Sequence, residues 1–194
     1  MAKTIITLGR EYCTGGRYIA EDVANALGIK LYDKELITMA AKHSGLSEEA
    51  VAASEKRHTH SLLYSLYTMG NELPLGDQVF ILQSRIIKQL AEEGPCVILG
   101  RCADEILREA GMESLNVFIH ADAVHRAVRA SELTGCTDAT ELQKIITKKD
   151  NSRHTYYNHY TGKKWGDSHN YHLVLDSGKL GYSLCAKLII EAAK

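Results

Sequence analysis

The sequence predicts an α/β fold in which helices cover both faces of a five-stranded parallel sheet. Five short segments are almost entirely apolar or β-branched, as strands buried on both faces are. Sequence with helical character follows them, and parallel strands need such crossover connections, which are right-handed. The predicted strands are residues 4–8, 29–33, 96–100, 115–120 and 172–176.

The first predicted unit is a strand, a glycine-containing turn and a helix. The strand at residues 4–8 ends at Gly9. Beyond the turn, Ile19, Val23 and Leu27 fall every four residues on one helical face, and Gly28 follows as a C-cap. This order of elements is typical of the opening of an α/β domain.

The middle of the chain predicts an inserted helical lobe. Residues 34–75 contain helix-forming stretches but no convincing strand, and Ser47 is a candidate N-cap. A core helix is expected at residues 77–93, and further helices are expected to begin near Ala103 and Ala121. The last helix should run from about residue 180, with Leu184, Leu188 and Ala192 on one face.

Residues 138–171 form a second region outside the regular alternation. Asp138 and Glu141 make a capping-box start for a helix. The stretch that follows, KKDNSRHTYYNHYTGKKWGDSHN, is polar, aromatic and basic, and it is too hydrophilic to lie in the core. Its aromatic rings could stack on a nucleotide base or pack the region onto the sheet, and we favour packing for most of them.

Length and composition limit the class of protein. The 194 residues suffice for one domain with an inserted lobe, and 23 Lys and Arg against 24 Asp and Glu give no overall field that attracts nucleic acid or an anionic membrane. Five scattered cysteines without a CxxC pair indicate reduced thiols, and none of the nine histidines has metal-ligand spacing. We expect an untargeted cytoplasmic protein and leave a homo-oligomer open.

The stretch LGREYCTGGRYIA, residues 8–20, predicts a phosphate site between the first strand and helix. Glycines there permit positive φ, so that successive N–H groups can point at one anion, and the helix N-terminus adds its partial charge. A standard phosphate loop is GxxxxGK[ST]. Here Gly16 stands in place of the lysine and Arg17 follows one residue later. The competing interpretation is a glycine pair that merely makes a tight turn.

Six collinear blocks of the sequence resemble the cytidylate kinase-like proteins, relatives of bacterial cytidylate kinase among the nucleoside monophosphate kinases. They are GREYCTGGRYIAEDVANALG, LYDKELI, GPCVILGRCADEIL, NVFIHADAVHRAVR, NSRHTYYNHYTGKKWGD and YHLVLDSGKLG. The resemblance implies a three-layer P-loop NTPase-type fold within one domain, residues 1–194. Residues 34–75 would then be the acceptor-binding lobe and residues 138–171 a basic lid.

The resemblance also implies cofactors and site residues. ATP and Mg²⁺ are the expected cofactors, and a small-molecule phosphoryl acceptor is the expected partner. The residues expected around the ATP phosphates are Arg10, Thr14, Gly15, Gly16, Arg17 and Tyr18. The expected catalytic cations are Arg17, Arg126 and Arg153, with Arg17 in place of the missing lysine. The expected acceptor contacts are Asp33, Arg101, Asp104 and Arg129, and Cys102 replaces the aspartate of the cytidylate kinase motif Gly-Arg-Asp.

Three functions follow as hypotheses. The first is an ATP-dependent phosphotransferase acting on a nucleoside monophosphate, with CMP or dCMP as first candidates. The others are a nucleotide-binding regulatory protein with weak or no turnover, and a kinase for a non-nucleotide small molecule. Arg101 either pairs with a carboxylate or meets a ligand phosphate, because it directly follows a buried strand. Asp33 either holds magnesium through water or caps the next helix.

Overall fold

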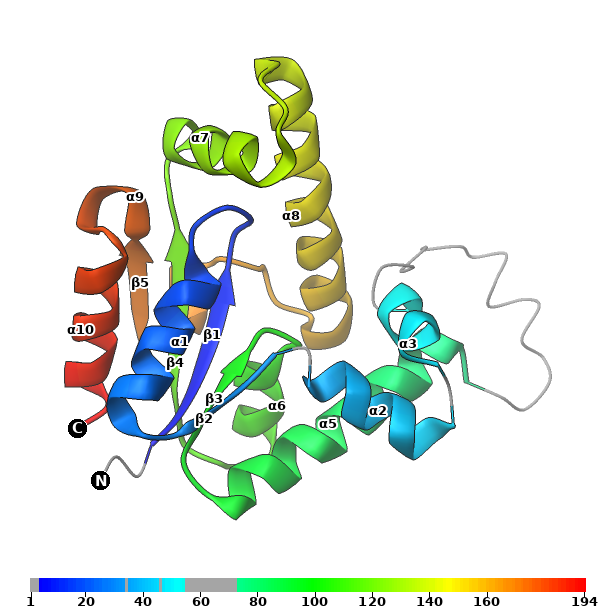
Figure 1. Ribbon diagram of the computed structural model, residues 1–194. Coiled ribbons are helices and arrows are strands. Elements are labelled where there is room, and N and C mark those ends of the chain that lie inside the picture. The colour runs from blue at the N-terminus through cyan, green and yellow to red at the C-terminus, as the bar shows by residue number, and fades with distance from the viewer. Residues whose placement is uncertain (1–3, 34, 46, 55–72) are drawn as a thin grey trace.

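The computed structural model describes residues 4–33, 35–45, 47–54 and 73–194, and it has an α/β fold with a five-stranded sheet (Figure 1). The strand order is β2-β3-β1-β4-β5, and every pairing is parallel. The strands are β1 (Ile5–Arg10), β2 (Lys30–Tyr32), β3 (Cys96–Leu99), β4 (Ser114–His120) and β5 (Leu173–Asp176). The predicted fold class and all five predicted strands are confirmed, with boundaries that differ by up to two residues.

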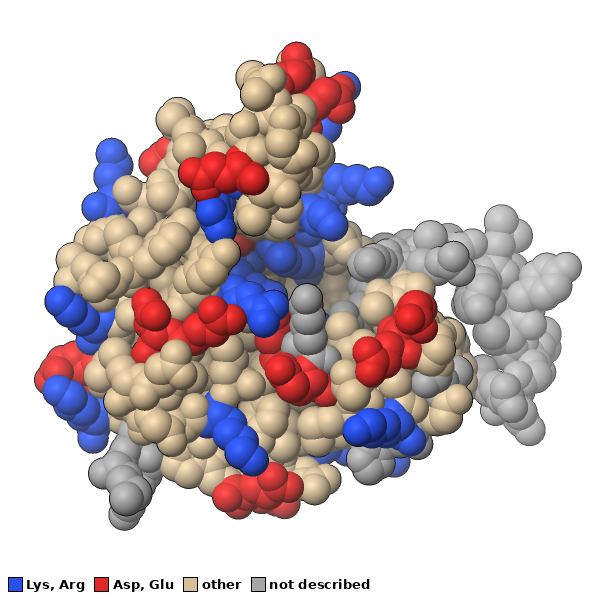
Figure 2. All heavy atoms as spheres, in the orientation of Figure 1, with Lys and Arg blue, Asp and Glu red and all other residues tan. Residues whose placement is uncertain are grey.

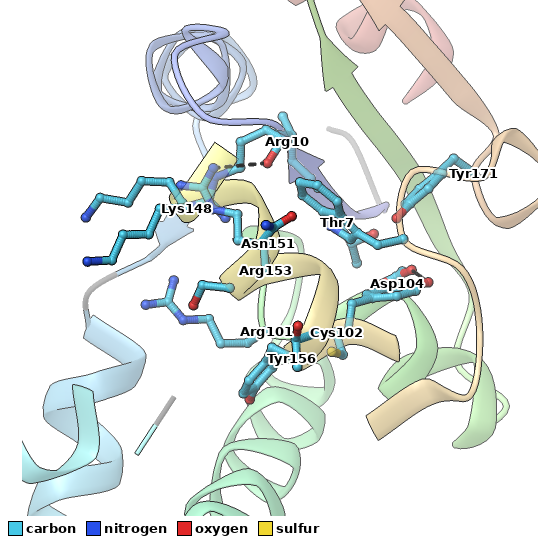
Figure 3. A pocket seen from close by; sticks show the side chains of 18 residues that line it. Thr7, Arg10, Arg101, Cys102, Asp104, Lys148, Asn151, Arg153, Tyr156 and Tyr171 are labelled. Carbon is cyan, nitrogen blue, oxygen red and sulfur yellow. Dashed lines mark hydrogen bonds between the residues drawn. The ribbon is translucent and has the colours of Figure 1, made fainter. Parts of the chain in front are cut away.

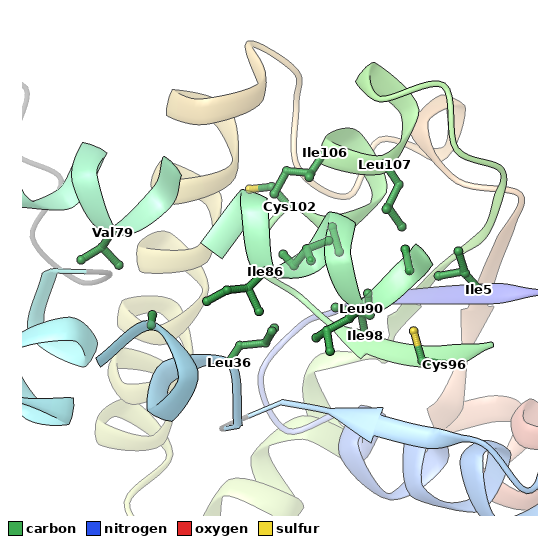
Figure 4. Packing of buried hydrophobic residues seen from close by; sticks show 14 of the residues in the cluster. Ile5, Leu36, Val79, Ile86, Leu90, Cys96, Ile98, Cys102, Ile106 and Leu107 are labelled. Carbon is green, nitrogen blue, oxygen red and sulfur yellow. The ribbon is translucent and has the colours of Figure 1, made fainter. Parts of the chain in front are cut away.

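Helices pack on both faces of this sheet because successive strand side chains point to opposite faces. Ile6 and Leu8 of β1 lie in a core cluster with α1 (Gly16–Leu27) and α10 (Tyr182–Ala192). Ile5 of the same strand lies in the other cluster, with α5 (Leu75–Glu93) and α6 (Ala103–Glu109). Figure 4 shows this second cluster between α5, α6 and β3.

Helix α10 turns a different face to the sheet from the one that the leucine spacing suggests. Leu184 and Leu188 do share a face, but they are 44% and 40% exposed. The buried face holds Cys185 and Ile189, each 0% exposed. The helix is apolar around most of its circumference, so its spacing alone could not identify the face that packs.

The predicted inserted lobe contains helices wherever the structure describes it. Helix α2 (Glu35–Ser44) and helix α3 (Glu48–Ser54) both pack against α5. Leu36 of α2 and Val51 of α3 are 0% exposed, so these helices extend the core cluster of α5 away from the sheet. Residues 34, 46 and 55–72 of the predicted lobe lie outside the described residues.

Two helices stand above the carboxyl end of the sheet (Figure 1). They are α7 (Ala123–Thr134) and the long α8 (Ala139–Thr161). The Asp138 carboxylate caps α8 by accepting from the Glu141 N–H, as the capping box predicts. The hydrophilic stretch that follows is largely a continuation of this helix, and its Tyr157 is buried, 5% exposed.

The chain returns to the sheet through the 3-10 helix η1 (Ser168–Asn170) and β5, and then the short α9 (Ser177–Leu180) leads into α10. In the part of the chain that is described, no helix combines the length and the apolar character that crossing a membrane requires.

Candidate functional site

A cavity of about 620 Å³ lies where the carboxyl ends of β1 and β3 face helix α8. Parallel α/β sheets place ligands at this end of the strands. Figure 2 shows lysine and arginine atoms gathered where this face is hollowed. In Figure 3, Lys148 and Arg101 extend to one side of the cavity, while Asp104 and Tyr171 lie on the other.

The loop between β1 and α1 owes its shape partly to the C-terminal region of the chain. Gly15 has φ +70°, and a Cβ there would lie 2.2 Å from the Tyr182 ring, so only glycine fits. The Ser177 hydroxyl, 0% exposed, donates to the Thr14 carbonyl at 2.8 Å. A Cβ on Gly16 would lie 2.8 Å from the Arg10 Cβ. Tight packing therefore requires both glycines of the predicted phosphate loop.

The Thr14 side chain turns into the protein and away from a loop ligand. Its hydroxyl donates to the Glu11 carbonyl at 2.9 Å, and the residue is 1% exposed. The Thr14 hydroxyl thus closes the turn, and the place of Thr14 around the ATP phosphates stays a prediction.

Three guanidinium groups surround the carboxylate of Asp33 just beyond β2. The shortest distances from an Asp33 carboxylate oxygen to a guanidinium nitrogen are 2.7 Å for Arg101, 3.5 Å for Arg17 and 3.8 Å for Arg10. Arg17 also pairs with the Glu21 carboxylate at 2.9 Å, so cations and carboxylates alternate in this cluster beside the loop.

This cluster bears on the alternatives for Arg101 and Asp33. Arg101 pairs with the Asp33 carboxylate and also lines the cavity, and its contact with a ligand phosphate stays a prediction. Within the described part of the chain, the Asp33 carboxylate contacts these arginines, and the Asp33 N–H donates to the Glu35 carboxylate at 3.0 Å.

Helix α8 contributes Lys148, Lys149 and Arg153 to the cavity. Burial lowers the pKa of Arg153 and nearby Arg101 lowers it further, while the Asp150 carboxylate at 3.6 Å opposes both effects. Arg153 also lies with its guanidinium carbon 5.7 Å from the centre of the Tyr12 ring. Arg153, which was expected to be a lid cation, thus lies between Tyr12 of the loop and the cavity.

The opposite side of the cavity carries a buried carboxyl group, that of Asp104. The residue is 9% exposed, and its carboxylate accepts from the Tyr157 hydroxyl at 2.7 Å. Burial raises the pKa of Asp104, although this hydrogen bond acts in the opposite direction. The cavity therefore has a cationic side and an acidic, aromatic side.

Arg126 lies outside the lining of this cavity, contrary to the expectation that it contacts the transferring group. Its Nε donates to the Tyr12 carbonyl at 2.9 Å, one terminal nitrogen donates to Glu11 at 3.0 Å, and the other pairs with Asp150. Each of the three guanidinium nitrogens of Arg126 is thus engaged by a group of the protein.

Arg129 and Tyr18 are also placed away from the 620 Å³ cavity. The Arg129 guanidinium lies over the Tyr18 ring, 5.2 Å from its centre, and donates to the Tyr18 hydroxyl at 2.8 Å. Tyr18 in turn stacks on Tyr182, with ring centres 6.3 Å apart. Arg129 lines a second cavity, of about 380 Å³, with Tyr182 and His125. Arg129 thus lies away from Arg101 and Asp104 of the large cavity, and its contact with an acceptor stays a prediction.

Sequence reasoning missed the two carboxylates that organise this end of the molecule, Glu11 and Asp150. Asp150 precedes Arg153 by three residues, so helical spacing alone could have paired them. Glu11 lies in the loop next to Arg10 and gave no comparable signal, because its partner Arg126 is 115 residues away.

Comparisons with known proteins identify the family and the fold of the chain. The model of the cytidylate kinase-like family matches residues 5–179. No curated protein matches the chain. Among solved structures, an uncharacterized protein from Eubacterium ventriosum is 28% identical, with a TM-score of 0.73 and 98% of each chain covered.

More distant solved structures share the fold. A shikimate kinase from Bacteroides thetaiotaomicron is 13% identical, with a TM-score of 0.55 and 97% of each chain covered. A gluconokinase from Sinorhizobium meliloti is 15% identical, with a TM-score of 0.51, covering 99% of this chain and 90% of its own. At such identities the likeness concerns the fold alone, which is that of the P-loop kinases.

Proposed function

The chain belongs to the cytidylate kinase-like family, and from this premise we propose that it transfers the γ-phosphoryl group of ATP to a small anionic acceptor. CMP and dCMP are the first candidates for the acceptor. The observation that supports this most is the convergence of cations from three elements on one cavity, namely Arg10 of β1, Arg101 beyond β3 and Arg153 of α8.

Phosphoryl transfer asks for positioning and charge rather than for covalent chemistry by the protein. Donor and acceptor must lie in line, cations must face the equatorial oxygens, and water must be excluded. Arg153 and Arg101 supply cations on the cavity side. Arg17, with its side chain 48% exposed and 3.5 Å from Asp33, supplies one at the loop. We assign to Arg17 the role that the lysine of a standard phosphate loop has, which is to hold the terminal phosphates of ATP.

Mg²⁺ supplies neutralisation of the β- and γ-phosphate oxygens when ATP binds. This ion keeps several waters and needs one or two carboxylates at most. Asp33 is surrounded by arginines, and the described residues contain no cluster of three metal-ligating side chains. The donor set therefore fits an ion that arrives bound to ATP rather than one held in a protein cage.

The second cavity would receive the base of ATP. It adjoins the phosphate loop, because the Tyr182 ring that lines it lies against Gly15. Tyr182 offers an aromatic face and Arg129 a guanidinium plane, and both stack on planar heterocycles. In this proposal Arg129, which was expected to contact the acceptor, contacts the donor instead, on the side where Tyr18 was expected.

The acceptor would span the large cavity. Its anionic group would meet Arg101 and Arg153, and its uncharged part would reach Tyr157 and Asp104 on the acidic, aromatic side. A second anion at that side is disfavoured by the Asp104 carboxylate. This division of charge favours an acceptor with one anionic end, as a nucleoside monophosphate has.

A regulatory protein that binds nucleotide with little turnover is the second candidate function. Two observations favour it: Gly16 stands where the lysine would, and the Thr14 hydroxyl is engaged with the Glu11 carbonyl. Saturable ATP binding without product would be its signature.

The deciding experiment measures ADP formation from Mg·ATP with CMP, dCMP, UMP, AMP and GMP supplied separately, and with small hydroxy acids as non-nucleotide acceptors. We expect turnover with a pyrimidine monophosphate and a fall in kcat of at least about a hundredfold in Arg17→Ala. Arg85→Ala, which removes an exposed arginine of α5, is the matched control and should retain activity. ATP binding with no turnover by any acceptor would instead support the regulatory protein.

A further inference from the structure

Both backbone groups of Tyr12, in the middle of the phosphate loop, are bound by side chains from the helices above the sheet. Its N–H donates to the Asp150 carboxylate of α8 at 2.7 Å. Its carbonyl accepts from the Arg126 Nε of α7 at 2.9 Å. The loop conformation is therefore set from outside the loop, by residues more than a hundred positions later in the chain.

The two side chains that bind Tyr12 also bind each other. Arg126 pairs with Asp150 through one terminal nitrogen and with Glu11 through the other. The three side chains are largely withdrawn from water, at 11% exposed for Arg126, 16% for Asp150 and 27% for Glu11. Hydrogen bonds between charged groups that are shielded from water are stronger than ion pairs on the surface, and they hold the side chains in a narrower geometry.

The same network reaches the cavity through Arg153. Asp150 lies one helical turn before Arg153, and their charged groups are 3.6 Å apart. Arg153 also donates to the Arg10 carbonyl at 3.4 Å. Asp150 thus has one contact that shapes the loop and another that faces the cation lining the cavity.

We propose that Arg126 and Asp150 form a positioning clamp that holds the phosphate loop and Arg153 in register with each other. The clamp consists of Arg126, Asp150 and Glu11 around the backbone of Tyr12. It deepens the proposed function, on which it rests, because donor phosphates on the loop and the cation of α8 must face the same transferring group. Neither Arg126 nor Asp150 is assigned contact with substrate.

The first test follows the loop itself and needs no activity. Cys13 follows Tyr12 in the loop, has φ +65° and is 7% exposed. Its alkylation by iodoacetamide, followed by peptide mass spectrometry, reports how often the loop opens. In Asp150→Asn we expect the rate at Cys13 to rise at least about tenfold, because a charged contact is lost. Cys96, buried in β3, should keep its rate.

The matched control is Glu141→Gln, which removes one negative charge from an exposed ion pair with Lys144 on the same helix. Its Cys13 rate should equal that of the wild type. An unchanged Cys13 rate in Asp150→Asn would overturn the clamp. A joint rise at Cys13 and Cys96 would also overturn it, since the whole molecule would then have loosened.

The second test asks whether the clamp needs the branched guanidinium of Arg126 or only its positive charge. Arg126→Lys keeps the charge but cannot span the Tyr12 carbonyl, Glu11 and Asp150 together. We expect kcat to fall at least about tenfold in both Arg126→Lys and Arg126→Gln, with a smaller rise in the KM of the acceptor. A kcat of Arg126→Lys equal to that of the wild type would contradict the requirement for the branched guanidinium of Arg126. If the wild type turns over no acceptor, the proposed function fails, and the alkylation rates alone decide on the clamp.

Discussion

At the scale of single residues, the buried carboxyl group of Asp104 couples the cavity to pH. Burial raises its pKa, with the Tyr157 hydroxyl opposing the rise. A carboxyl group with a raised pKa in the folded state holds its proton more tightly than the unfolded chain does. Its contribution to stability is therefore greatest at low pH and is lost as pH rises through the folded pKa.

This sign gives a prediction for Asp104→Asn. The free energy of unfolding of the wild type minus that of Asp104→Asn should fall as pH rises from the acid range toward neutrality, because the variant lacks the titrating group. Urea unfolding at a series of pH values measures the difference. Tyr157→Phe should move the fall to higher pH, since it removes the hydrogen bond that favours the ionised form. Parallel pH profiles for wild type and Asp104→Asn would contradict this prediction.

Sequence reasoning reached some residues of the site and not others for a physical reason. Arg101 could be placed because the end of a buried strand faces the ligand edge of a parallel sheet. Arg126 could be placed near the site but not given its contacts, since Glu11 lies 115 residues away and no local pattern connects the two. Which groups an arginine side chain contacts depends on partners that are this far away in the sequence.

At the scale of elements, the first strand, loop and helix are shaped by a packing contact with α10. The Tyr182 ring occupies the space beside Gly15 that a side chain would need. The alternative interpretation of the glycine pair was a simple tight turn. It accounts for Gly15, because the Tyr182 ring leaves no room for a side chain there. The neighbouring cations Arg10 and Arg17 distinguish this loop from an ordinary turn.

We predict that Gly15→Ala lowers the free energy of unfolding by at least about 2 kcal/mol. The methyl group would meet the Tyr182 ring, and φ +70° adds a conformational cost of about 1 kcal/mol for a residue with a Cβ. Urea unfolding of Gly15→Ala, Tyr182→Ala and the double variant separates the two terms. The double variant should be more stable than the sum of the single changes implies, because the ring is gone. Full additivity would mean that the ring and the methyl group do not meet.

Elements were easier to predict than the faces they bury. Strands such as β3 are short apolar runs bounded by glycine, which few other structures produce. In α10, by contrast, the exposed Leu184 and Leu188 and the buried Cys185 and Ile189 give nearly equal apolar stripes. The choice between them depends on where the sheet lies, which the helix sequence does not contain.

At the scale of the whole molecule, a nearly neutral protein concentrates positive charge in one place. The net charge is −1, yet the large cavity is lined by five cations, Arg10, Arg101, Lys148, Lys149 and Arg153. The composition excludes a global positive field, so any phosphate site has to be local. Only the fold could bring the cations together, because they come from segments separated by up to 143 residues.

We predict that sodium tripolyphosphate binds this cavity and raises the thermal midpoint without ATP or acceptor. At a hundred times its Kd, a ligand stabilises the folded state by about 2.7 kcal/mol. Added NaCl should weaken the binding, since partly exposed charges are screened. Differential scanning fluorimetry measures the midpoint. The double variant Lys148→Ala/Lys149→Ala should show a smaller shift than Lys42→Ala/Lys187→Ala, which removes two exposed lysines elsewhere. Equal shifts would place the anion outside the cavity.

The dependence of the loop on Ser177 and Tyr182 has a consequence for biosynthesis. A ribosome releases β1 and the loop first, but the hydroxyl that fixes the Thr14 carbonyl and the ring that packs on Gly15 emerge more than 160 residues later. Because a domain generally folds as a unit, the loop cannot take its final shape until these C-terminal residues have left the ribosome. The loop near the start of the sequence is thus completed last, and a translation product truncated before residue 177 would lack both contacts that shape it.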